Sequence, residues 1–150
     1  MAHYNVTLPS SHSQELVFQY LANFSSVQEW DPSVLEAKSL NEPYCVGAKF
    51  LVVVRFLGRE TPFEYETIEY EEGQRIVLRA QSKTVTSLDT ITVNAQPDGG
   101  STVTYDALLD LRGVFQVFNP ILQLLFQKLG DNAKTGLSEK INQKTLGLSE

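Results

Sequence analysis

The stretch that decides the fold runs from Asn119 to Ile141 and reads NPILQLLFQKLGDNAKTGLSEKI. The Asn119 side chain can cap a helix, and Pro120 suits the first helical position, because no backbone N–H is needed there. The apolar residues that follow at helical spacing are Leu122, Leu125, Phe126, Leu129, Ala133, Leu137 and Ile141. We therefore predict one long amphipathic helix at the end of the chain, which needs a surface to pack against.

The side chains on the buried face of this helix become smaller towards its C-terminal end. Its first half carries the bulky Leu122, Phe126 and Leu129, whereas Ala133 and Gly136 follow on the same face. A glycine inside a helix costs about 1 kcal/mol relative to alanine, so its presence needs a reason. We expect a cavity beneath Ala133 and Gly136; the alternative is that Gly136 lets a strand or the short helices approach closely. We also expect the tightest packing at Phe126 and fraying towards the C-terminal end.

The chain before this helix predicts a sheet. Helical spacing of Val17, Tyr20, Leu21 and Phe24 predicts an amphipathic helix, and a second short helix should end at Pro32. The segments with strand-like alternation or apolar runs are Tyr4–Leu8, Val34–Leu40, Val46–Leu57, Thr61–Glu71, Arg75–Ser82, Val85–Val93 and Val103–Leu111.

Short turns join most of these strands, which favours antiparallel pairing. A change of phase in the fourth strand predicts a β-bulge near Thr67. The predicted fold is therefore of the α+β class: a curved seven-stranded antiparallel sheet wrapped around the long C-terminal helix, with two short helices after the first strand. We expect residues 1–150 to form a single domain, and a curved sheet around one helix is difficult to fill completely.

Composition narrows the possible functions. The chain has 150 residues, of which 42% are hydrophobic, and a net charge of −6, which argues against binding to nucleic acid or anionic lipid. The single Cys45 excludes an intramolecular disulfide and fits a reducing compartment. No apolar run is long enough to span a membrane, and the first residues do not resemble a signal peptide. We expect a cytoplasmic protein with no integral membrane association, and the sequence predicts no particular oligomeric state.

Several short segments carry a resemblance to a known family. They are VFQYLA (residues 17–22), VQEWDP (27–32), VGAKF (46–50), PDGGSTVTY (97–105) and LRG (111–113). Together with the order of elements, they resemble the polyketide cyclase/dehydrase and lipid-transport superfamily, the helix-grip or START-like domains that include the birch pollen allergen type. The resemblance implies a deep apolar pocket between helix and sheet, which members use for lipids, hormones, quinones or polyketides. It implies no particular catalytic residues.

Asp89 is the most informative polar residue. The alternation through Val85, Ile91 and Val93 places Asp89 and Ser87 on the inward face, where a carboxylate is costly unless it is paired or hydrogen-bonded. Burial in an apolar cavity would raise its pKa and suit it to acid–base catalysis, so it is the candidate catalytic residue. The alternative is a shifted register that turns Asp89 to solvent.

Aromatic and aliphatic residues are candidates for the ligand-binding wall. Tyr65 and Tyr105 point inward by phase, and Trp30 lies where the short helices meet the sheet; the alternative for each is plain core packing. The other candidate ligand-binding residues are Phe50, Val52, Val54, Leu78, Ser87, Leu129, Ala133 and Gly136. His3, His12 and Cys45 lack metal-ligand spacing, and no phosphate loop or dinucleotide fingerprint is present, so we expect no metal and no cofactor.

Three functions remain open from the sequence. The first is binding or carriage of a small apolar or amphipathic molecule without catalysis, favoured because no catalytic constellation stands out. The second is a cyclase or dehydratase that acts on a polyketide-like substrate with Asp89 and a tyrosine as acid and base, without metal or nucleotide. The third is a protein-interaction module with an incidental cavity. Burial of Asp89 beside a pocket distinguishes the first two, and the third predicts no sizeable cavity.

Overall fold

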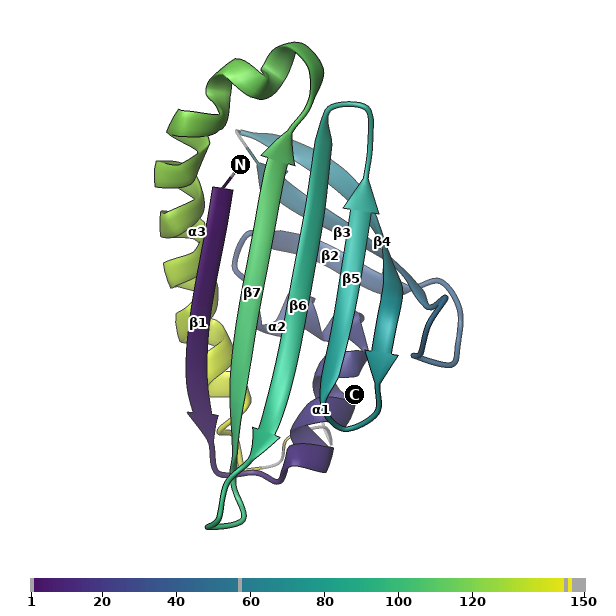
Figure 1. The fold of residues 1–150 in the computed structure, drawn as a ribbon, viewed down its shortest axis with the longest axis vertical. Coiled ribbons are helices and arrows are strands. Elements are labelled where there is room, and N and C mark those ends of the chain that lie inside the picture. Colours follow the sequence, from purple (N-terminus) through teal and green to yellow (C-terminus); the bar gives the residue numbers. More distant parts are fainter. Residues whose placement is uncertain (1, 57, 145, 147–150) are drawn as a thin grey trace.

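A single curved sheet of seven strands is the largest element of the molecule (Figure 1). The computed structural model describes residues 2–56, 58–144 and 146; Leu57, the expected end of the third strand, and residues 1, 145 and 147–150 of the expected domain lie outside them. The strands are β1 (Ala2–Ser10), β2 (Val34–Ser39), β3 (Lys49–Phe56), β4 (Arg59–Glu71), β5 (Arg75–Gln81), β6 (Val85–Ala95) and β7 (Ser101–Leu111). Their order across the sheet is β1-β7-β6-β5-β4-β3-β2, and every neighbouring pair is antiparallel.

Alternation along the strands decides which face is buried. In β6 every second residue from Val85 to Val93 is buried, because successive side chains of a strand point to opposite faces. The predicted bulge is confirmed, since the pairing of β4 with β5 shifts register between Thr67 and Glu69. The expected start of the third strand at Val46 is wrong: β3 begins at Lys49, because Gly47 adopts a φ of 97° that breaks the extended backbone.

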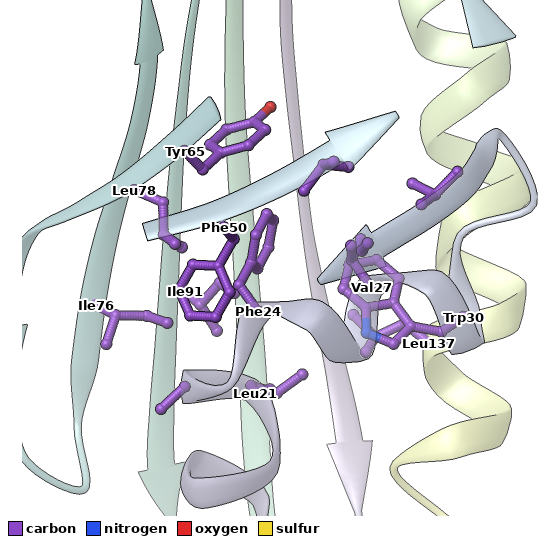
Figure 2. Packing of buried hydrophobic residues seen from close by; sticks show 14 of the residues in the cluster. Leu21, Phe24, Val27, Trp30, Phe50, Tyr65, Ile76, Leu78, Ile91 and Leu137 are labelled. Atoms are coloured by element: carbon purple, nitrogen blue, oxygen red, sulfur yellow. The ribbon is translucent and has the colours of Figure 1, made fainter. Parts of the chain in front are cut away.

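Three short elements fill one end of the curved sheet. They are α1 (Gln14–Ala22), the 3₁₀ turn η1 (Phe24–Ser26) and α2 (Val27–Trp30). Phe24 meets Phe50 edge-to-face at 6.2 Å between ring centroids and meets Tyr65 at 5.2 Å. Figure 2 shows these rings beside Leu78 and Ile91 of the sheet. Buried hydrophobic side chains therefore fill the contact between these elements and the sheet.

The long helix α3 (Asn119–Lys140) follows the 3₁₀ segment η2 (Gly113–Phe118) and packs on β1 and α2. Asn119 does not cap it as expected; its side-chain Oδ1 accepts the backbone N–H of Leu111 at 3.1 Å and so ties the helix start to the end of β7. The expected distribution of packing is also wrong. Ile141 is fully buried and Phe126 only half-buried, because the C-terminal part of α3 packs against α2.

Two glycines set how closely α3 approaches its neighbours. A Cβ placed on Gly136 would lie 1.9 Å from the backbone oxygen of Trp30, and one on Gly130 would lie 2.5 Å from the ring of Tyr4. Both distances are far below van der Waals contact. The expectation of a cavity beneath Gly136 is therefore wrong, and the alternative of close approach by a short helix is correct at that position.

Candidate functional site

A cavity of about 120 Å³ lies between α3 and the curved sheet. Its floor comes from β1, β3, β4, β6 and β7, and its roof from the middle of α3. The residues that line it are Tyr4, Val6, Trp30, Asp31, Ser33, Val54, Phe56, Phe63, Tyr65, Ser87, Asp89, Tyr105, Ala107, Leu109, Phe126, Leu129, Gly130, Ala133, Lys134 and Leu137. Most of this wall is apolar or aromatic, which is typical of sites for small organic molecules. The interaction-module hypothesis predicted no sizeable cavity, and the structure differs from that expectation.

One chain of hydrogen bonds crosses the sheet side of the cavity. The hydroxyl of Tyr65 in β4 lies 2.7 Å from Ser87 Oγ in β6. Ser87 Oγ lies 3.5 Å from Asp89 Oδ1, and the Tyr105 hydroxyl of β7 donates a short hydrogen bond to Asp89 Oδ2. The alternation of β4, β6 and β7 aims all four side chains at the same space. This chain of hydrogen bonds therefore includes a single carboxyl group, that of Asp89, inside a mainly apolar cavity.

Asp89 is buried, with 6% of its surface exposed. Its pairing with Leu78 of β5 and Ala107 of β7 fixes the inward register, so the alternative in which Asp89 faces solvent is wrong. Burial raises the pKa of Asp89 to about 7, against the opposing effect of the hydrogen bond from Tyr105. At neutral pH the carboxyl group is therefore divided between its protonated and ionised forms.

A second carboxyl group, Asp31, also lines the cavity. It follows α2, and its Oδ1 accepts hydrogen bonds from the Ser33 backbone N–H at 2.9 Å and the Ser33 hydroxyl at 2.7 Å. Burial raises the pKa of Asp31, while both bonds from Ser33 lower it. Burial and the charge of Asp89 also raise the pKa values of Tyr65 and Tyr105 well above their ordinary range. Both phenols therefore keep their protons at neutral pH.

The structure gathers most of the predicted site residues around the cavity. Those in its wall are Trp30, Val54, Tyr65, Ser87, Asp89, Tyr105, Leu129 and Ala133. The predictions for Phe50, Val52, Leu78 and Gly136 need correction. The first three are buried in the hydrophobic core and do not line the cavity. Figure 2 shows Phe50 and Leu78 beside Phe24 of η1. Gly136 packs against Trp30, as described above.

Several wall residues were missed by sequence reasoning. Phe56, Phe63, Ala107 and Leu109 share the inward phase of Val54, Tyr65 and Tyr105, so alternation was a signal that could have found them. Asp31 gave no such signal, because it lies in an irregular connection between α2 and β2, where no periodicity assigns a face.

Neither a metal site nor a membrane-spanning helix emerges from the described ranges. In residues 2–56, 58–144 and 146, no group of three or more His, Cys, Asp or Glu side chains has a geometry that would hold a metal ion. Over the same residues, no helix combines the length and the apolar character that crossing a bilayer requires.

Solved structures with the same fold come from several bacteria. A START superfamily protein from Mycobacterium smegmatis superposes with a TM-score of 0.78 at 13% identity, covering 97% of this chain and 100% of that one. The Zhui aromatase/cyclase from Streptomyces sp. R1128 gives 0.75 at 11% identity, covering 93% and 92%. The protein TTHA0849 from Thermus thermophilus gives 0.73 at 14% identity, covering 93% and 95%. At these identities the likeness shows a shared fold alone.

Comparison of the sequence itself gives the family. A search of curated proteins finds no match. The family described as polyketide cyclase / dehydrase and lipid transport matches residues 1–141, which is nearly the whole chain. The chain has the curved sheet and long C-terminal helix of the START-like helix-grip fold. It belongs to the polyketide cyclase / dehydrase and lipid transport family.

Proposed function

We propose that this protein binds a small, mainly apolar molecule in the cavity beneath α3. The observation that carries the proposal is the cavity itself: an apolar and aromatic wall that holds two hydrogen-bonded carboxyl groups, Asp31 and Asp89. Such a wall shelters an apolar body from water, and a few placed polar groups fix its orientation. A volume of about 120 Å³ suits a molecule built around a single ring.

Filling the cavity tests this proposal. Ala133 faces the cavity from α3, so Ala133→Leu should occupy the ligand's space. Binding of the one-ring probe ethylbenzene, followed by isothermal titration calorimetry, should weaken at least tenfold. The matched control is Thr135→Leu on the exposed side of the same helix, which should leave uptake unchanged. Equal uptake by the wild type and both variants would remove the cavity as the binding site. Native mass spectrometry of the purified protein would then identify any ligand that co-purifies.

A second candidate function is acid–base catalysis of the cyclase or dehydratase type. It is favoured by the pKa of about 7 for Asp89, because a group with a pKa near the working pH can both take and give a proton. In dehydration of a β-hydroxy ketone, Asp89 would remove the proton α to the carbonyl. It would then return that proton to the departing hydroxyl group, which leaves as water and yields an enone.

The catalytic candidate has its own test. Conversion of 4-hydroxy-4-phenyl-2-butanone to its enone can be followed by ultraviolet absorbance with wild-type protein and with Asp89→Asn. Catalysis by Asp89 requires a rate above background that depends on pH around 7 and is lost in the variant. Ethylbenzene binding that survives in Asp89→Asn, together with no rate in the wild type on this substrate, would favour binding alone.

A further inference from the structure

Two carboxyl groups belong to the cavity wall without a positive charge paired to either. Asp31 follows α2 and Asp89 lies in β6, so the fold brings them to one space from distant parts of the chain. Within the part of the chain that the structure describes, no lysine, arginine or histidine forms an ion pair with Asp31 or Asp89. Carboxylates in apolar surroundings are normally paired, because they lose their water on burial. A cation that enters the cavity would supply the missing partner.

The hydrogen bonds to these carboxyl groups leave acceptor capacity on both. The two bonds from Ser33 reach Oδ1 of Asp31, and among the described residues Oδ2 of Asp31 has no hydrogen-bond partner. Asp89 accepts a bond from Tyr105 on Oδ2, whereas the contact of Ser87 with Oδ1 is long at 3.5 Å. A carboxylate offers about four acceptor sites, so each group can accept a further N–H donor.

Aromatic rings accompany the two carboxyl groups in the wall. Trp30 precedes Asp31 in the sequence, and its ring packs edge-to-face on Tyr105 with 5.5 Å between centroids and 77° between planes. The Tyr105 hydroxyl donates to Asp89, so this pair of rings connects the two acidic positions. Further rings come from β3, β4 and α3 and include Phe56, Phe63 and Phe126. Aromatic rings attract cations, and aromatic cages are a recurrent way of binding organic ammonium groups.

The wall also contains one lysine, Lys134 of α3. Its side chain is exposed to solvent, whereas Asp31 is half-buried and Asp89 is buried. Water around an exposed charge weakens its interaction with other groups. Within the described residues, no hydrogen bond or ion pair joins Lys134 to either carboxyl group. The less exposed part of the wall is therefore acidic and aromatic.

We propose that the ligand of this cavity is a small single-ring amine whose protonated amino group pairs with Asp31 and Asp89. The inference rests on the proposed function, because it names the class of molecule that the cavity takes. A neutral hydrocarbon would leave both carboxyl groups without a cation. A carboxylate would face two groups of its own charge, with only the exposed Lys134 to attract it. An ammonium group can donate N–H bonds to the free carboxyl oxygens while its ring fills the apolar part of the cavity.

Calorimetric titration with three single-ring probes tests the class of ligand. Benzylamine, which is protonated at neutral pH, and ethylbenzene have the same number of heavy atoms, and benzoate carries a negative charge. At pH 8 we expect benzylamine to bind the full-length protein about tenfold more tightly than ethylbenzene, and benzoate to bind more weakly than either. Benzylamine affinity equal to or below that of ethylbenzene would overturn the inference and leave the proposed function standing. Benzoate as the tightest probe would overturn it in favour of recognition through Lys134. Failure of all three probes to bind would overturn the proposed function as well.

The pH dependence of benzylamine affinity is a second measurement. The titratable groups of the described cavity wall are Tyr4, Asp31, Tyr65, Asp89, Tyr105 and Lys134. Burial raises the pKa values of the three tyrosines above their ordinary range, so the phenols keep their protons. Burial also raises the pKa of Asp89 to about 7 and that of Asp31, so these carboxyl groups gain protons as the pH falls from 8 to 5. Benzylamine affinity should therefore fall about tenfold or more over this range, and ethylbenzene affinity less than about twofold. A benzylamine affinity that does not change with pH contradicts the pairing.

Variants locate the recognition of charge. Asp31→Asn and Asp89→Asn remove a carboxylate with little change of shape, so the ratio of benzylamine affinity to ethylbenzene affinity should fall about fivefold or more in each. Glu64→Gln on the exposed side of β4 removes the same charge outside the cavity and should keep the wild-type ratio. Ala133→Leu should weaken the binding of both probes. An equal loss of the ratio in Glu64→Gln, or benzylamine binding unchanged in Ala133→Leu, would overturn the inference. The wild-type titrations decide the question even if a variant fails to fold.

Discussion

Replacement of Asp89 by asparagine should change how stability depends on pH. Burial gives the folded protein an Asp89 pKa of about 7, against an ordinary value of 3.8 that we take for the unfolded chain. The difference of about 3 pH units corresponds to about 4 kcal/mol, since one unit is about 1.36 kcal/mol. The folded state therefore favours the protonated carboxyl group by this order of magnitude.

The sign follows from which state binds the proton. Below about pH 4 the carboxyl group is protonated in both states, and the wild type has its full stability. Between about pH 4 and pH 7 the unfolded chain ionises while the folded protein keeps its proton, so the free energy of unfolding falls by about 4 kcal/mol. Above about pH 7 the loss is complete. Asp89→Asn does not ionise and should therefore gain about 4 kcal/mol relative to the wild type between pH 4 and pH 8.

Urea denaturation of both proteins at each pH unit from 4 to 8 measures this difference. The raised pKa of Asp31 acts in the same direction, and its effect largely cancels because both proteins contain it. Glu64→Gln, at an exposed position of β4, is the matched control, and its free energy of unfolding should depend on pH as that of the wild type does. A stability difference between Asp89→Asn and the wild type that stays constant across this range would refute the buried, neutral carboxyl group.

Three further substitutions test the packing and the hydrogen-bond chain. Gly136→Ala should destabilise the protein by about 1–3 kcal/mol or more in chemical denaturation, because the added methyl would lie 1.9 Å from a backbone oxygen of α2; an unchanged midpoint would contradict this close packing. Ile141→Ala should cost about 2–5 kcal/mol and more than Phe126→Ala, because the first residue is fully buried and the second half-buried; the opposite order would mean that the core is misplaced. Tyr105→Phe should raise the pKa of Asp89 above about 7, since the lost hydrogen bond favours the ionised form; carbon NMR titration of the carboxyl group would show a lower or equal midpoint if this is wrong.

Most of the fold was predictable from the sequence because alternation is a local property. In β6 the spacing from Val85 to Val93 already assigns Asp89 to the inward face, and the register with β5 and β7 agrees. The bulge at Thr67 was predictable for the same reason, since one extra residue reverses which side chains of the strand point inward. Such signals need only the neighbouring residues along the chain.

The extent of the cavity was not predictable in this way. Val52 and Val54 share one face of β3, yet Val52 lies in the core and Val54 lines the cavity. The difference depends on where η1 and α2 cover the sheet, which is a long-range contact that alternation does not encode. Gly136 shows the same limit: a small residue in a helix fits either an open space or a close neighbour, and only the position of Trp30 decides between them.

The pairing of β1 with β7 has a consequence for how the chain is made. Ala2 lies opposite Leu109, whereas each strand from β2 to β6 pairs with the strand that follows it along the chain. During synthesis, β1 therefore cannot form its sheet hydrogen bonds until β7 has left the ribosome. The helix that packs on β1 is made later still. A growing chain can therefore form its meander of hairpins early, but it encloses the ligand cavity only as one of the last steps of folding.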